Sequence, residues 1–204
     1  MSTTLTGAAY PVTVGFTAGA RTLWPLSKKL AVMRALCEHL EGITREAGYE
    51  YDLTPTTVQG KTTPRVWRGR AVFGEETPVP CLSVLEAPTP DESPFVGGEN
   101  EGQVHAQWVL LVQGWVQTPD DHPTDPAYQF MAAVEHRLHE IISVRSNGRP
   151  VNADAYMLGN RIAGLRVGPG VVRPPQDQVS SRAFFYLPLA VKLAVDISQP
   201  FVAA

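Results

Sequence analysis

The run AFFYLPLAVKLAVDI over residues 183–197 constrains the fold more than any other part of the sequence. Every second residue from Phe185 to Ile197 is apolar, which is the period of a strand with one face in a core. Pro188 interrupts the run and has no N–H to donate to a neighbouring strand, so we expect a sheet edge or a bulge there. The run therefore predicts a long strand in a sheet that covers a core.

Further strands are expected where the same alternation recurs. Over residues 103–117, one face carries Val104, Ala106, Trp108, Leu110 and Val112, and the other carries Val109, Leu111 and Trp115. Shorter strands are expected over 66–74, VWRGRAVFG, and over 81–87, CLSVLEA, paired antiparallel, and another over 161–167. Residues 168–180 lack a regular period and are expected to be irregular.

Two amphipathic helices are indicated by apolar residues three and four positions apart. Ser27 can cap the first helix and Gly48 ends it, while Thr124 or Asp125 can cap the second, which Asn147-Gly148 breaks. The first apolar stripe is Leu30, Met33, Leu36, Cys37, Leu40, Ile43 and Ala47, and the second is Tyr128, Met131, Val134, Leu138, Ile141 and Ile142.

The order helix, three strands, helix, two strands predicts an α+β fold with a mainly antiparallel sheet and two helices packed on one face. At 204 residues, of which 44% are hydrophobic and 18% charged, the chain can bury a core without disulfides. We expect an extended N-terminal arm over residues 1–26 and one α+β domain with long irregular loops over 27–204. No export signal is indicated and no apolar run approaches about 20 residues, so we expect a soluble protein that enters no membrane.

Two helices cover one face of such a sheet, and the apolar residues on the other face need a different cover. A neighbouring subunit is one candidate, and the interface residues would then be Val109, Leu111, Trp115, Phe184 and Tyr186. The alternative is that the N-terminal segment or the long loops of the same chain fold over this face. Arg68 and Arg70 are expected on one strand face, where they meet a neighbour's carboxylates, line a passage for DNA or face solvent.

Residues 88–102, PTPDESPFVGGENEG, combine proline, glycine and acidic residues with little apolar content, which predicts a long exposed loop. Loops of this length often carry function. The candidates for docking a partner are Asp91, Glu92, Phe95, Glu99 and Glu101, although solvation explains the acidic residues equally well.

The sequence offers little for catalysis. His136 and His139 are three residues apart on the second helix with Glu140 beside them, but no third strong ligand stands nearby, so we expect a polar helix surface and no metal or cofactor. No nucleophile elbow, phosphate-binding loop or C-x-x-C pair is present. The net charge of −3 argues against a general nucleic-acid binder. Cys37 and Cys81 are expected to be buried, reduced thiols.

Four stretches, taken in order, resemble the tail terminator proteins of long-tailed, siphovirus-like bacteriophages. They are KKLAVMRALCEHL, the segment from VWRGRAVFG to CLSVLEA, WVLLVQGWVQTPDDHPTDPAYQFMAAVEHRL and SRAFFYLPLAVKLAVDI. They span most of residues 28–197, and the likeness is one of order and pattern. The arm over 1–26, the loop over 88–102 and the stretch over 168–180 depart from the family pattern.

The resemblance implies a virion protein of the tail neck region, assembled in the host cytoplasm, that forms a homo-oligomeric, hexameric ring and is not an enzyme. Such a ring caps the head-proximal end of the tail tube, contacts the tail tube protein and the head connector, and lets DNA pass through its lumen without specific binding. The alternatives are a neck or head-completion subunit and a metal-dependent hydrolase centred on His136 and His139.

Overall fold

The structure is a computed structural model that describes residues 6–7, 10–11, 25–58, 60–74, 76–87, 103–175, 181–196 and 201–202. Its strands are β1 (Thr6–Gly7), β2 (Tyr10–Pro11), β3 (Thr56–Val58), β4 (Lys61–Thr63), β5 (Val66–Arg68), β6 (Cys81–Glu86), β7 (Gln103–Trp115), β8 (Gly164–Val167), β9 (Val171–Arg173) and β10 (Phe184–Asp196). Its helices are α1 (Lys28–Glu41), α2 (Asp125–His139) and the single turn α3 (Met157–Asn160). Most of the arm expected over 1–26 lies outside the described residues.

The largest sheet has the strand order β5-β6-β7-β10-β8, with β9 also paired to β10. β7 and β10 are antiparallel and pair along their full lengths, from Trp115 opposite Phe184 to Gln103 opposite Asp196. β8 and β9 pair antiparallel with the other edge of β10. The predicted α+β class with a mainly antiparallel sheet is therefore confirmed.

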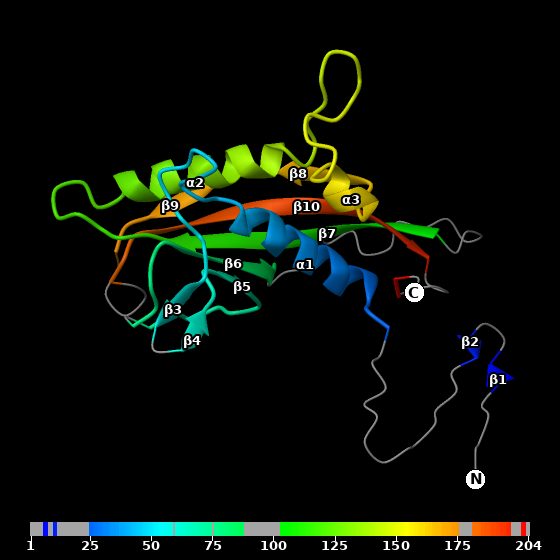
Figure 1. The fold of residues 1–204 in the computed structure, drawn as a ribbon, viewed down its shortest axis with the longest axis horizontal. Helices are drawn as coiled ribbons and strands as arrows, with labels where there is room; N and C mark the ends of the chain where they lie inside the picture. Colours follow the sequence, from blue (N-terminus) through cyan, green and yellow to red (C-terminus); the bar gives the residue numbers. More distant parts are fainter. Residues whose placement is uncertain are drawn as a thin grey trace, which may run out of the picture.

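The core lies between this sheet and the helices, on what we call the inner face (Figure 1). As the alternation predicted, the sheet contributes Trp108, Leu110, Val112, Phe185, Leu187, Leu189, Val191 and Leu193, together with Leu82 and Val84 of β6. The helices contribute Val32, Leu36, Leu40, Phe130, Val134, Leu138 and Leu158. The described helices thus all bury their apolar residues on one face of the sheet, as predicted for the two long ones.

Helix α1 begins as predicted but ends earlier. The Ser27 side chain accepts a hydrogen bond from the Leu30 N–H at 3.2 Å, which caps the helix. The helix ends at Glu41 because Gly42 turns the chain, and Ile43 stays fully buried beyond it. Leu30 is 40% exposed and Ala47 is exposed, so the predicted stripe is wrong at both of its ends.

Helix α2 also differs from its predicted stripe. Ala127 and Phe130 are fully buried, whereas Tyr128 is 55% exposed. Both sets of residues have helical spacing, and the sheet selects the stripe with Phe130, whose ring lies 5.6 Å from that of Phe185. The helix ends at His139, and Asn147-Gly148 lies instead in a separate turn closed by the Arg145 N–H and the Arg149 carbonyl at 2.7 Å.

The predicted antiparallel pairing of the two short strands is wrong, because β5 and β6 are parallel. β5 ends at Arg68, where Gly69 adopts a φ of 70° that favours glycine. The chain then crosses the other face of the sheet and re-enters as β6 in the same direction. Arg68 and Arg70 therefore do not share a strand face.

The irregularity expected at Pro188 occurs on one side of β10. Its pairing with β7 continues past Pro188 without a break. On the other side the partner changes from β8 to β9: Leu189 faces Val167 and Tyr186 faces Val171, so three residues along β10 match four along its partner. The strand β9 itself corrects the expectation that 168–180 is wholly irregular.

Cys37 and Cys81 are free and buried, as predicted. Burial raises the pKa of Cys37 to about 12 and that of Cys81 to about 11. Both thiols are therefore protonated at neutral pH, and a protonated thiol is a poor nucleophile.

Candidate subunit interface

The outer face of the sheet, opposite the helices, carries five aromatic side chains in a continuous row from β5 to β10. The ring centroids are separated by 6.1 Å for Trp67 and Phe73, 4.3 Å for Phe73 and Trp115, 6.5 Å for Trp115 and Phe184, and 6.2 Å for Phe184 and Tyr186. Aromatic pairs at these separations contribute stability in addition to the stability that comes from their buried area. We call these five residues the aromatic row.

Strand register places most of the row. Trp115 of β7 is directly opposite Phe184 of β10, and both point outward because their neighbours Gly114 and Phe185 face the core. Tyr186 follows two residues later on the same face. Phe73 reaches the row from the segment 69–80 that folds back over the sheet.

An arginine lies at each end of the aromatic row. The Arg70 guanidinium lies 4.3 Å from the ring centroid of Trp67 and 4.7 Å from that of Phe73. The Arg173 guanidinium lies 5.8 Å from the ring centroid of Tyr186, and its Nε donates to the Tyr186 hydroxyl at 2.8 Å. At exposed sites, the interaction of a cation with an aromatic face contributes about 0.5–1 kcal/mol. The row is thus an apolar strip with a positive charge at both ends.

The chain itself covers one corner of the outer face. The segment 69–80 is fixed by a hydrogen bond from the Ser83 hydroxyl to the Arg70 carbonyl at 2.7 Å and by one from the Arg182 Nη1 to the Thr77 carbonyl at 2.7 Å. Under it, Cys81 and Ser83 are fully buried, and Trp115 is only 9% exposed. At this corner, the alternative prediction that the same chain covers the outer face is therefore correct. Trp115 is covered largely by its own subunit.

Other apolar residues on the outer face are half-buried. Val109, Leu111, Phe184, Tyr186 and Ala190 all have partly exposed side chains. No described helix lies over them, because the described helices pack on the inner face. These residues therefore present a partly exposed apolar surface next to the aromatic row.

The sequence identified part of this surface. Trp115, Phe184, Tyr186 and Arg70 come together as one cluster, with Val109 and Leu111 on the same face of β7. Arg68 is exposed, and the arginines that lie over the rings of the row are Arg70 and Arg173. Trp67, Phe73 and Arg173 were not among the residues expected at this surface, and no pattern in the sequence marked Arg173.

The candidate docking loop lies outside the described residues. Asp91, Glu92, Phe95, Glu99 and Glu101 all fall in the range 88–102, for which the structure gives no description.

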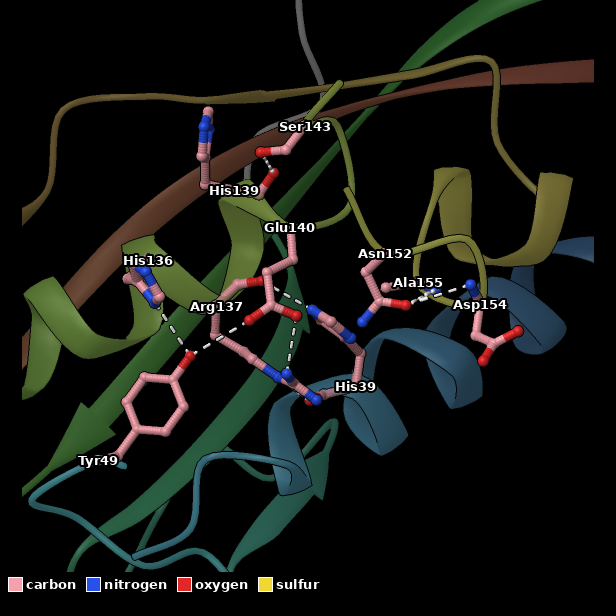
Figure 2. A network of polar contacts seen from close by, with 10 residues as sticks. All are labelled: His39, Tyr49, His136, Arg137, His139, Glu140, Ser143, Asn152, Asp154 and Ala155. Atoms are coloured by element: carbon pink, nitrogen blue, oxygen red, sulfur yellow. Dashed lines mark hydrogen bonds and ion pairs between the residues drawn. The ribbon is translucent and has the colours of Figure 1, made fainter. Parts of the chain in front are cut away.

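The candidate metal ligands take part in polar contacts with neighbouring residues (Figure 2). The Tyr49 hydroxyl lies 3.1 Å from Nδ1 of His136, and Glu140 forms an ion pair with Arg137 at 2.8 Å. The ring of His139 points away from both in Figure 2. Within the part of the chain that the structure describes, no three His, Cys, Asp or Glu residues are grouped to hold a metal ion.

His39 and Arg137 join the ends of α1 and α2 by a reciprocal pair of hydrogen bonds (Figure 2). Nε2 of His39 lies 2.7 Å from the Arg137 carbonyl, and Nε of Arg137 donates to the His39 carbonyl at 2.9 Å. Since a carbonyl only accepts, Nε2 must carry the proton. Burial lowers the pKa of His39, so the neutral ring is favoured. This pair supports the helix layer that backs the sheet.

The sequence matches no family model among known protein families, and no curated protein is similar to it. None of the described helices combines the length and the apolar content that crossing a membrane requires.

Proposed function

We propose that the protein is a structural subunit of a bacteriophage virion that caps the head-proximal end of the tail tube as a ring. The ring terminates growth of the tube and provides the docking surface for the head connector. The observation that carries the proposal is the half-buried apolar outer face with its aromatic row. The order of the elements, which resembles that of tail terminator proteins, supports it.

The chemistry of the outer face favours assembly with another protein. Interface cores are enriched in aromatic residues and arginine and depleted of acidic residues and lysine. The exposed part of the row, Phe184 and Tyr186 beside Arg173, has this composition. Contact between unlike surfaces of successive copies closes into a ring when the rotation suits the number of copies, and the family resemblance suggests six.

The partners follow from the same proposal. The tube protein and the connector meet the two rims of the ring, and the loop 88–102 is the candidate contact with one of them. DNA passes through the lumen without specific binding, because a chain with a net charge of −3 has no surplus of cations for phosphates.

The test uses Phe184→Asp with two controls. Phe184 is half-buried on the outer face, so its replacement should leave the subunit folded and abolish its self-association in sedimentation velocity. Tyr128→Asp replaces an aromatic residue that is 55% exposed on α2 and should assemble like the wild type. Phe185→Asp places a charge in the core and should prevent folding.

The proposal is contradicted if Phe184→Asp assembles like the wild type. It is also contradicted by a wild-type chain that stays monomeric and leaves the growth of purified tail tubes unchanged.

A further inference from the structure

One end of the molecule carries a basic cleft. The cleft, of about 480 Å³, lies beside the start of α1 and the turn after α3, and is lined by Lys28, Arg161, Ile162 and Val202 among others. None of the described residues that line it is acidic. Nη1 of Arg161 donates to the Leu158 carbonyl at 2.7 Å, which fixes the guanidinium. Neither Lys28 nor Arg161 forms an ion pair with a described residue.

Exposed apolar side chains occur at the same end of the molecule as the basic cleft. The chain around Phe201 pairs with Ser27, and the Val202 N–H donates to the Leu26 carbonyl at 2.8 Å. Leu30, Phe201 and Val202 at this end are 40%, 40% and 41% exposed. Two cations with no ion-pair partner among the described residues, beside exposed apolar side chains, are typical of a contact site for an acidic, partly apolar partner.

The opposite end of the molecule carries the complementary charge. The chain from 117 to 124, which we call the acidic loop, projects beyond α2 at the left of Figure 1, while the start of α1 and the C-terminus lie to the right. Its Asp120 and Asp121 are exposed, and neither forms an ion pair with a described residue. The Ala183 N–H donates to the Thr118 hydroxyl at 2.8 Å, which holds the loop beside Phe184. The acidic loop is therefore continuous with the aromatic row.

We propose that the acidic loop of one copy binds in the basic cleft of the next copy, head to tail. The inference rests on the proposed ring, and it names the basic cleft as the surface that the acidic loop of the neighbouring subunit contacts. Two ends of opposite charge and shared apolar character match each other and not themselves, so the contact is heterologous. Such contacts close into a ring when the rotation between copies suits their number. Opposite charges also orient copies whose equal net charge repels them.

Two variants test the contact, and each reverses the charge of one end. Lys28→Glu/Arg161→Glu makes the cleft acidic, and Asp120→Lys/Asp121→Lys makes the loop basic. Each variant then has two like-charged ends and should stay monomeric at concentrations where the wild type assembles. An equimolar mixture restores opposite charges at every contact, because reversed loop meets reversed cleft and native loop meets native cleft. The mixture should regain the sedimentation coefficient of the wild-type assembly.

Folding is controlled separately by circular dichroism and urea unfolding of each variant. Glutamate in the first turn of α1 is favourable to the helix dipole, so Lys28→Glu should not weaken the helix. If a double variant fails to fold, Lys28→Glu and Asp121→Lys form the single-residue pair for the same mixing experiment.

The contact is wrong if either variant assembles alone like the wild type, or if the folded mixture stays monomeric. A wild-type chain that does not self-associate overturns the contact as well. The ring function is judged independently by capping of purified tubes, which does not depend on these four charges meeting in solution.

Discussion

Gly114 lies where the sheet packs closely against its core, with no room for a side chain. It lies on the inner face of β7, opposite Phe185 of β10 and Leu82 of β6. A Cβ at Gly114 would lie 2.5 Å from Cζ of Phe185 and 2.9 Å from Cδ2 of Leu82, and closer still to Cε1 of Phe185. Favourable carbon contacts require about 3.5–4.0 Å. Phe185 is fully buried, and its ring lies 5.6 Å from that of Phe130.

Gly114→Ala should therefore lower the free energy of unfolding by about 1–3 kcal/mol, the usual cost of inserting a methyl group into a packed core. With a urea m-value of about 2–3 kcal/mol/M, the midpoint should fall by about 0.3–1.5 M. Gly164→Ala is the matched control, because its Cβ would lie 3.7 Å from Cβ of Lys192, an ordinary contact. Urea unfolding is measured by tryptophan fluorescence. Equal urea midpoints for the two variants would refute this description of the core.

Two further predictions concern buried titratable groups. Burial lowers the pKa of His39 from its ordinary 6.5. The unfolded chain therefore binds a proton at His39 more readily than the folded chain does. The stability that the neutral His39 contributes is present above about pH 6.5 and is lost as the pH falls through the lowered pKa. His39→Gln should reduce the loss of urea stability between pH 7.5 and 5.5, and an unchanged loss would contradict this role. Cys37 and Cys81, whose pKa values burial raises to about 12 and about 11, should react with a disulfide reagent at pH 8 only on unfolding; rapid labelling of the native chain would disagree.

The elements with a strict period were predictable from the sequence. The alternation from Phe185 to Leu193 is the alternation that the sheet buries, because only side chains on one face of a strand meet the core. Ser27 likewise caps α1 as expected. Local chemistry decides these features, and it is fully present in the sequence.

Features that depend on distant parts of the chain were not predictable in the same way. The period of a strand carries no information about direction, so the parallel pairing of β5 and β6 was missed. In α2, the apolar stripes through Tyr128 and through Phe130 have the same spacing. Only the contact with Phe185 determines that the stripe with Phe130 is the buried one. The outer-face cluster was predicted in part. The alternation along the last strand placed Phe184 and Tyr186 on the outer face, whereas Phe73 and Arg173 join the cluster from a folded-back segment and a short edge strand.

The mass of the native assembly shows whether the outer face and the two charged ends hold copies of the chain together in a closed ring. If the outer face and the two charged ends hold copies together, the purified wild-type chain of 22.2 kDa should give one closed species at a fixed multiple of that mass, six copies by the family resemblance. The mass should stay constant as the protein concentration rises, since a closed ring leaves no free ends. A monomer at every concentration, or an open series that grows without limit, would contradict the claim.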